Sequence, residues 1–326
     1  MTADVPPQDP AWVPIGSTPD EGAPPGSGVE VEAPAPAGGE PGRSPSARAA
    51  GRPLALHPMG VPDILDGAFT LFKANARPLV LVTALFMVPI ELVTAFLSRD
   101  VFGGMGLLEA ARETSIVGFT VTSGPGSTVA SLLAFAFTVL VRPALTAALV
   151  HLAASAYLGV ADRPGDAVRR ATRRWPAFVA AFVLVHLIEG FGFAFLLLPG
   201  LLAVALCTAV VPVMAVEGLG PGEALGRSFR LSGPRLFPTV LVVVATAAIS
   251  SALATALGGI PNLAALLIGY SRAWVLAATG TVLAALVVQP YVACVALLVY
   301  VDGRIRQEGL DIAVRMEELA SVEDPR

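Results

Sequence analysis

Six long apolar stretches dominate this chain and restrict the folds open to it. A helix needs about 20 apolar residues, at 1.5 Å each, to cross a hydrocarbon core. The mean hydropathy is +0.72 and only 14% of the residues are charged, against about 25% in a soluble domain. The sequence therefore predicts an all-α integral membrane protein with about six transmembrane helices, at about 78–98, 128–158, 177–198, 200–217, 236–258 and 274–301.

Prolines and glycines inside these stretches indicate where helices bend or end. Pro199 and Gly200 predict a tight turn between the third and fourth spans. Pro143 predicts a kink in the second span, and Pro212 leaves the boundary of the short fourth span open. The pair 258–259, two glycines, is expected to end the fifth helix.

The ends of the chain differ in composition from its middle. Residues 1–55 contain 12 of the 28 prolines, with much Gly and Ala, and cannot bury enough apolar surface to offset their ordering entropy. We expect a disordered tail at 1–55, a polytopic membrane domain at 56–316 and a short tail at 317–326. No apolar signal segment lies in the first 50 residues, so the N-terminal tail is expected in the cytoplasm.

Basic residues next to the spans predict the orientation of the chain. Cytoplasmic flanks carry the excess of Lys and Arg. One side would hold Lys73, Arg77, Arg163, Arg169, Arg170, Arg173, Arg174, Arg227, Arg230, Arg235, Arg304 and Arg306, and the other Arg99, Arg112 and Arg272. Both termini are therefore predicted to be cytoplasmic. Lys73 is the only lysine among 21 basic residues, a bias typical of a GC-rich bacterial genome, so the membrane is expected to be a bacterial plasma membrane.

Three short segments, each before a predicted hairpin, share one pattern. An acid follows a proline by one or two residues at Asp63, Asp166 and Glu223, and apolar residues recur at offsets 1, 2, 5 and 6. Proline and an acid both favour the first turn of a helix. We interpret the segments as amphipathic helices on the cytoplasmic leaflet in three parallel repeats; plain charged loops and chance similarity are the alternatives. Their candidate headgroup-binding residues are Arg169, Arg170, Arg173, Arg174, Arg227 and Arg230.

Four segments carry a resemblance to a known family. They are 212–231 (PVMAVEGLGPGEALGRSFRL), 62–69 (PDILDGAF), 157–170 (YLGVADRPGDAVRR) and 300–310 (YVDGRIRQEGL). In these the chain resembles the membrane domain of glycerophosphoryl diester phosphodiesterases, over roughly residues 56–316. The resemblance implies a multi-helix membrane domain that accompanies a catalytic barrel in some relatives. Such a barrel is absent from this sequence, so no phosphodiesterase activity is expected.

Ionisable residues inside the predicted spans are costly and are functional candidates. They are Glu91, Arg142, His151, His186 and Glu189. Counted from the cytoplasmic ends at 1.5 Å per residue, Glu91, Arg142 and Glu189 lie about 17–24 Å deep, and His186 shares a helix face with Glu189. The candidate polar cluster is therefore Glu91, Arg142, His186 and Glu189. It could form an ion pair of Arg142 with Glu189 or Glu91, or a polar pathway for an ion, proton or small solute.

Motifs of known catalytic chemistry are missing from the sequence. There are three histidines, no H-E-x-x-H zinc pair, no G-x-S-x-G elbow and no phosphate-binding G-x-x-x-x-G-K-[ST] loop. We expect no enzyme activity, metal, cofactor or nucleic-acid partner. The leading hypothesis is a non-enzymatic membrane protein that organises partners or anionic lipids at the cytoplasmic face. The alternative is a small transporter or channel that uses the polar cluster, and no protein partner is identified by the sequence.

Overall fold

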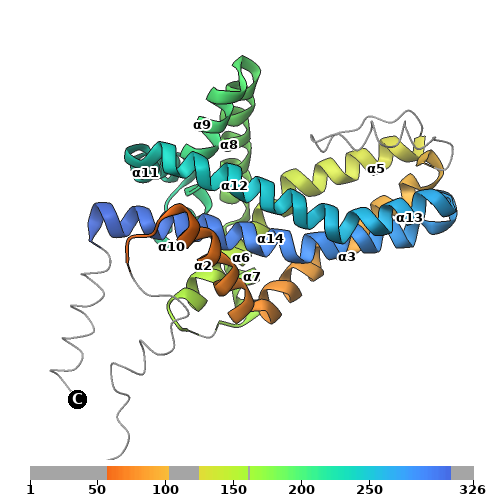
Figure 1. Cartoon of the computed structure of the whole chain (residues 1–326), viewed down its shortest axis with the longest axis horizontal. Helices are drawn as coiled ribbons and strands as arrows, with labels where there is room; N and C mark the ends of the chain where they lie inside the picture. The colour runs from red at the N-terminus through yellow and green to blue at the C-terminus, as the bar shows by residue number, and fades with distance from the viewer. Residues whose placement is uncertain (1–56, 103–124, 161, 310–326) are drawn as a thin grey trace, which may run out of the picture. The chain divides into compact units, whose positions relative to one another are not determined.

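A computed structural model describes residues 57–102, 125–160 and 162–309, and every secondary-structure element in these ranges is helical (Figure 1). The predicted tails at 1–55 and 317–326 lie outside the described residues. In chain order the elements are α2 (Val61–Ala74), α3 (Ala76–Phe102), α5 (Pro125–Ala136), the π-helical η1 (Phe137–Val141), α6 (Arg142–Tyr157), α7 (Pro164–Arg173), α8 (Trp175–Phe195), α9 (Leu197–Cys207), α10 (Val210–Glu217), α11 (Pro221–Ser232), the 3₁₀-helical η2 (Gly233–Arg235), α12 (Leu236–Ala254), the π-helical η3 (Thr255–Gly259), α13 (Ile260–Ile268) and α14 (Tyr270–Glu308).

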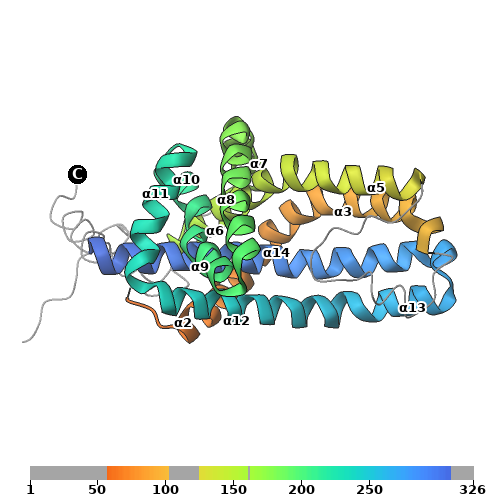
Figure 2. The ribbon, with the colours of Figure 1, turned by 90° about the horizontal axis from the view of Figure 1, so that it is seen from above.

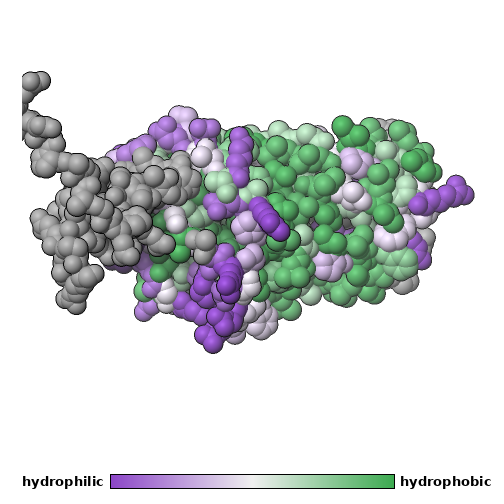
Figure 3. All heavy atoms as spheres, turned by 90° about the horizontal axis from the view of Figure 1, so that it is seen from below, coloured by the Kyte–Doolittle hydropathy of each residue, from purple (hydrophilic) through white to green (hydrophobic). Residues whose placement is uncertain are grey.

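Six helical stretches of the described residues are long and apolar enough to cross a membrane, which confirms the predicted number. They are Ala76–Leu97, Leu132–Tyr157, Trp175–Phe195, Leu197–Glu217, Pro221–Ile268 and Ser271–Glu308. Many of their large apolar side chains are exposed, among them Leu81, Leu132, Phe191 and Leu267. An exposed apolar surface of this kind suits a lipid solvent. Figure 3 shows one face of the molecule with hydrophobic residues over its middle and hydrophilic residues toward its ends.

Two of the predicted helix ends are wrong. Gly258 and Gly259 do not end the fifth helix, because the π-helical η3 carries the backbone through them into α13. The turn before α9 lies at Leu196, whose backbone is extended at φ −169° and ψ 163°. Pro199 belongs to the first turn of α9, where its missing N–H has no helical partner to lose.

The predicted irregularity at Pro143 takes the form of a π-helical segment. The π-helical η1 directly precedes α6, in which Pro143 lies in the first turn. A proline removes one backbone donor and crowds the preceding turn, which wider helical turns relieve. Trp175, the first residue of α8, donates its indole N–H to the carbonyl of Leu140 in this segment. The π-helical segment therefore also accepts a hydrogen bond from the start of α8.

The three segments that the sequence marked as short helices are helical. Each helix, α2, α7 and α11, has a proline at its first or second position and an acid in its first turn. In α2 and α11 the acid accepts a hydrogen bond from the N-cap glycine, Gly60 N to Asp63 Oδ2 at 2.8 Å and Gly220 N to Glu223 Oε2 at 3.1 Å. The residues one and five positions after each acid are buried: Ile64, Ala68, Ala167, Ala171, Ala224 and Ser228.

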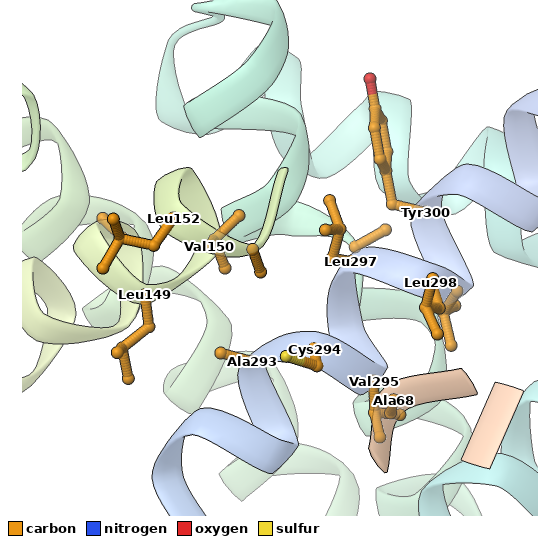
Figure 4. Packing of buried hydrophobic residues seen from close by; sticks show 14 of the residues in the cluster. Ala68, Leu149, Val150, Leu152, Ala293, Cys294, Val295, Leu297, Leu298 and Tyr300 are labelled. Atoms are coloured by element: carbon orange, nitrogen blue, oxygen red, sulfur yellow. The ribbon is translucent and has the colours of Figure 1, made fainter. Parts of the chain in front are cut away.

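The core lies where α6 and the C-terminal half of α14 meet, together with α2, α7 and α10. Figure 4 shows Leu149, Val150 and Leu152 of α6 near Ala293 and Leu297 of α14. These side chains are almost completely buried. In contrast, the α8–α9 hairpin is buried mainly at its base, and its tip stands clear of α14 in Figure 1. Figure 2 shows the same hairpin nearly end-on.

Small residues let η3 and α13 approach α14 closely. A Cβ at Gly280 would lie 2.8 Å from Pro261 Cβ and 2.9 Å from the carbonyl oxygen of Gly258. Contacts of this kind hold helices together in membranes, where lipid removes the hydrophobic drive for association. Gly280 therefore brings the fifth and sixth spans into direct backbone contact.

Candidate functional site

The linker between α10 and α11 is held by charged groups at the end of α14. Glu217 accepts from Arg227, with Nε to Oε2 at 3.0 Å and Nη2 to Oε1 at 3.2 Å. Tyr300 donates its hydroxyl to Glu217 Oε1 at 3.0 Å. Arg227 also pairs with Glu308, which accepts from Arg304 at 2.9 Å. This linker network joins residues up to 91 positions apart, so it fastens α11 to the last helix.

Arg227 was a candidate for headgroup binding, and the structure places it in this network. Its guanidinium is shared by two carboxylates, and its side chain is 20% exposed. The next residue, Ser228, donates to the carbonyl of Leu206 at 2.5 Å. Gly218 has a φ of +71°, which favours glycine. The E-G-L-G and A-L-x-R-S residues thus act in packing α11 against its neighbours.

A second set of charges gathers around Asp302, which is buried near the end of α14. Its carboxylate accepts from the backbone N–H of Met59 at 2.7 Å, from Arg235 at 2.8 Å and from Arg306 at 2.9 Å. Both arginines also donate to the carbonyl of Met59. The segment before α2, the start of α12 and the end of α14 are therefore joined at one carboxylate.

A basic cleft lies between α6, α7, α8 and α10. Its volume is about 260 Å³, and its lining residues are His151, Arg170, Arg173, Arg174, Phe178, Met214 and Ala215. Arg170 pairs with Asp162. Arg174 donates to the carbonyls of Leu219 at 2.9 Å and Met214 at 3.3 Å. Among the described residues, the Arg173 side chain has no hydrogen-bonding or ionic partner.

Three of the predicted headgroup-binding arginines therefore share the basic cleft, and three do not. Arg169 is 67% exposed and pairs with Asp166 on its own helix at 3.0 Å. Arg230 is exposed on α11, and Arg227 belongs to the linker network. His151 is a residue that sequence reasoning treated only as an intramembrane histidine. Its nearness to the α7 arginines had no signal in the sequence, because the two helices are brought together by packing.

A larger cleft opens between α6, α8, α9, α10 and α14. We name it the intramembrane cleft because candidate spans form its walls. Its volume is about 320 Å³. Its polar lining side chains are Arg142, Thr146, His186, Cys207, Thr208, Glu189 and Gln289, and the walls are otherwise apolar. The cleft exists because α8 packs on α6, α10 and α11 and makes no extensive contact with α14.

Three of the four residues in the predicted polar cluster line this cleft. Arg142, His186 and Glu189 do so, whereas Glu91 is half-buried on α3 and does not. The predicted ion pair is not observed: within the described ranges, no carboxylate lies within 4 Å of the Arg142 guanidinium. Gln289 was missed, although it is the only amide side chain in the last predicted span, 274–301.

Metal chemistry receives no support from the part of the chain that the structure describes. No group of three or more His, Cys, Asp or Glu side chains in these ranges is placed to hold a metal ion. Cys207 and Cys294 are both buried as free thiols.

The chain matches no protein-family model, no curated protein and no solved structure.

Proposed function

We propose that this chain is a non-enzymatic, multi-pass protein of a bacterial plasma membrane that binds anionic phospholipid headgroups at its cytoplasmic face. The observation that carries the proposal is the basic cleft. It combines three arginines and a histidine with the apolar side chains of Phe178, Met214 and Ala215. A phosphate needs several N–H donors, and the acyl chain below it needs an apolar wall.

The hydrogen bonds around the cleft leave donors free for a phosphate. Arg170 and Arg174 are held in place by Asp162 and by backbone carbonyls. Arg173 offers its whole guanidinium, since no partner engages it among the described residues. Two fixed arginines and one free arginine are a good arrangement for a bidentate phosphate contact.

The resemblance to the membrane domain of glycerophosphoryl diester phosphodiesterases supports a membrane role and is part of this proposal. Its most specific residues, such as Glu217 and Arg227, belong to the linker network. In any relative with the same motif, these residues would stabilise the fold. Because their contacts are structural, the proposal contains no catalytic step.

We further propose that the membrane domain consists of three repeats, each a short helix followed by a transmembrane hairpin. Each short helix follows an extended N-cap residue, at Gly60, Arg163 and Gly220. Each is joined to its span by a residue of similar non-helical conformation, directly after α2 and α7 and at the end of η2 after α11. These residues are Asn75 (φ −129°, ψ 29°), Arg174 (φ −110°, ψ 19°) and Arg235 (φ −123°, ψ 35°). Counted from the N-cap to this junction residue, the middle copy is four residues, about one helical turn, shorter than the other two.

The packing of the short helices supports a cyclic arrangement of these repeats. Each packs on the last span of the preceding unit: α7 on α6, α11 on α10, and α2 on α14. The connecting arginines follow the same order. Arg174 donates to the carbonyl of Leu219, just before the α11 N-cap, and Arg235 donates to that of Met59, just before the α2 N-cap. This order is expected for parallel repeats about an axis normal to the membrane.

Lipid binding by the basic cleft is tested with full-length protein in detergent. Native mass spectrometry would count bound phosphatidylglycerol on the wild type and on the Arg173→Gln variant. We expect Arg173→Gln to weaken binding by roughly tenfold, because one charge-assisted contact is lost.

Arg169→Gln is the matched control. It removes the same charge from the same helix but lies outside the cleft. An equal loss of lipid in both variants would show that only overall charge matters and would contradict a defined site.

A second candidate function is a small transporter, favoured by one observation. Arg142 lines the intramembrane cleft without a partner among the described residues. A charge in the apolar layer costs about 2.5–3.5 kcal/mol even by translocon-based scales. A water-filled or ligand-filled path would reduce this cost.

A further inference from the structure

The intramembrane cleft contains opposite charges that do not pair with each other. Arg142 is exposed within it, and Glu189 is half-buried on the neighbouring α8. No ion pair or hydrogen bond within the described ranges engages either side chain, nor the amide of Gln289. At the membrane depth that the sequence predicts for Arg142 and Glu189, a polar group without a partner costs free energy.

His186 adds an imidazole ring to the same cleft, and the hydrogen bond of this ring assigns the donor and acceptor roles of its two nitrogens. Its Nδ1 lies 2.9 Å from the carbonyl oxygen of Phe182. Since a carbonyl only accepts, Nδ1 is the protonated nitrogen. The other ring nitrogen, Nε2, is then an acceptor in the neutral ring. The cleft therefore has a cationic donor at Arg142 and two acceptors, Glu189 and His186, on one face of α8.

We propose that the intramembrane cleft is a binding site for a zwitterionic headgroup, in which an anionic group and an ammonium group are joined by a short linker. Phosphoethanolamine has this chemistry, both in a phospholipid and as a free solute. The anionic group would bind Arg142, and the ammonium group would bind Glu189 and His186. Gln289 can donate to the first or accept from the second.

Ligands of a single charge fit this cleft less well. An anion would satisfy Arg142 but would lie near the Glu189 carboxylate, and a cation would meet the reverse problem. A zwitterion satisfies both charges without adding net charge to an apolar layer. The apolar walls, with Phe178, Val185 and Val292, suit the methylene groups next to such a headgroup.

This site shares the Phe178 side chain with the basic cleft, but its charged residues are different, and it does not depend on the function proposed there. It shares its location with the second candidate function, but binding and transport are separate measurements. A zwitterion that binds without crossing the membrane would support the site and contradict the transporter.

Full-length protein in detergent would be titrated with phosphatidylethanolamine and with phosphatidylglycerol, and bound lipids would be counted by native mass spectrometry. We expect Glu189→Gln, which keeps the side-chain shape, to weaken phosphatidylethanolamine binding by at least roughly tenfold. It should leave phosphatidylglycerol binding unchanged or stronger, because Arg142 is then unopposed. Arg142→Gln should weaken phosphatidylethanolamine binding as well.

Glu91→Gln is the matched control, since Glu91 is a half-buried carboxylate of a spanning helix outside the cleft. It should bind phosphatidylethanolamine like the wild type. The proposal is overturned if the wild type binds no phosphatidylethanolamine, a result that needs no variant to fold. It is also overturned if Glu189→Gln binds it normally, or if Glu91→Gln is equally impaired. Water-soluble phosphoethanolamine forms the second arm: displacement of the lipid identifies a site open to solutes, and persistence of the lipid identifies a lipid site.

Discussion

Asp302 shows how one carboxylate can organise the end of a helical bundle. It is 5% exposed and accepts from Met59, Arg235 and Arg306, which come from three separate parts of the chain. Hydrogen bonds to a charged group contribute more than neutral ones, and removing one partner leaves the others unsatisfied. Its effect on stability should therefore exceed that of an ordinary surface acid.

We expect Asp302→Asn to lower the free energy of unfolding by about 2–4 kcal/mol, since an amide nitrogen would then face N–H donors. Thermal unfolding in detergent would show this as a lower midpoint. Asp66→Asn is the control, because Asp66 is an exposed carboxylate on α2 with no partner among the described residues. Equal midpoints for the two variants would show that the Asp302 contacts contribute nothing to stability.

At the scale of helices, Gly280 and Gly190 differ in their surroundings: Gly280 is closely packed, and Gly190 has free space around it. A Cβ at Gly280 would meet the backbone of η3 and the ring of Pro261 at less than 3 Å, whereas a Cβ at Gly190 on α8 would meet nothing within 4 Å. Both glycines lie in helix interiors. The same substitution should therefore have opposite effects at the two positions.

Gly280→Ala should destabilise the protein by about 1–3 kcal/mol, because the added methyl group forces α13 away from α14. Gly190→Ala should leave stability unchanged or raise it by up to about 1 kcal/mol, since alanine favours a helix more than glycine does. Chemical unfolding of both variants measures the difference. If Gly280→Ala proved as stable as the wild type, the close approach of these helices would be refuted.

At the scale of the whole molecule, the predicted orientation rests on the distribution of arginines and is open to direct measurement. Gly165 on α7 and Ser271 on α14 are exposed, while the native Cys207 and Cys294 are buried. With an impermeant thiol reagent on intact cells, we expect Ser271→Cys to react. Gly165→Cys should react only after the cells are opened. The reverse pattern would invert the proposed topology.

Local patterns in the sequence predicted the number of candidate spans and the three short helices. Six apolar runs predicted the six candidate spans, because the length of an apolar helix is a property of consecutive residues. A proline followed by an acid predicted the starts of α2, α7 and α11 for the same reason. The sequence was not sufficient at Gly258 and Gly259. Glycine can end a helix, or it can remain inside a helix that packs closely on another.

The candidate sites depended on tertiary packing. Arg142 and Glu189 were predicted to pair from their similar depth, yet they line one cleft without an ion pair. The depth of a residue along its helix does not tell which way its side chain faces or how the neighbouring helix packs. In the structure, α8 makes no extensive contact with α14. The same limit explains why His151 joins the α7 arginines, and why Glu217 is bound by Arg227 and by Tyr300, which is 83 residues away. Hydropathy and periodicity act between neighbours along the chain, whereas these contacts are set by how close-packed helices cross.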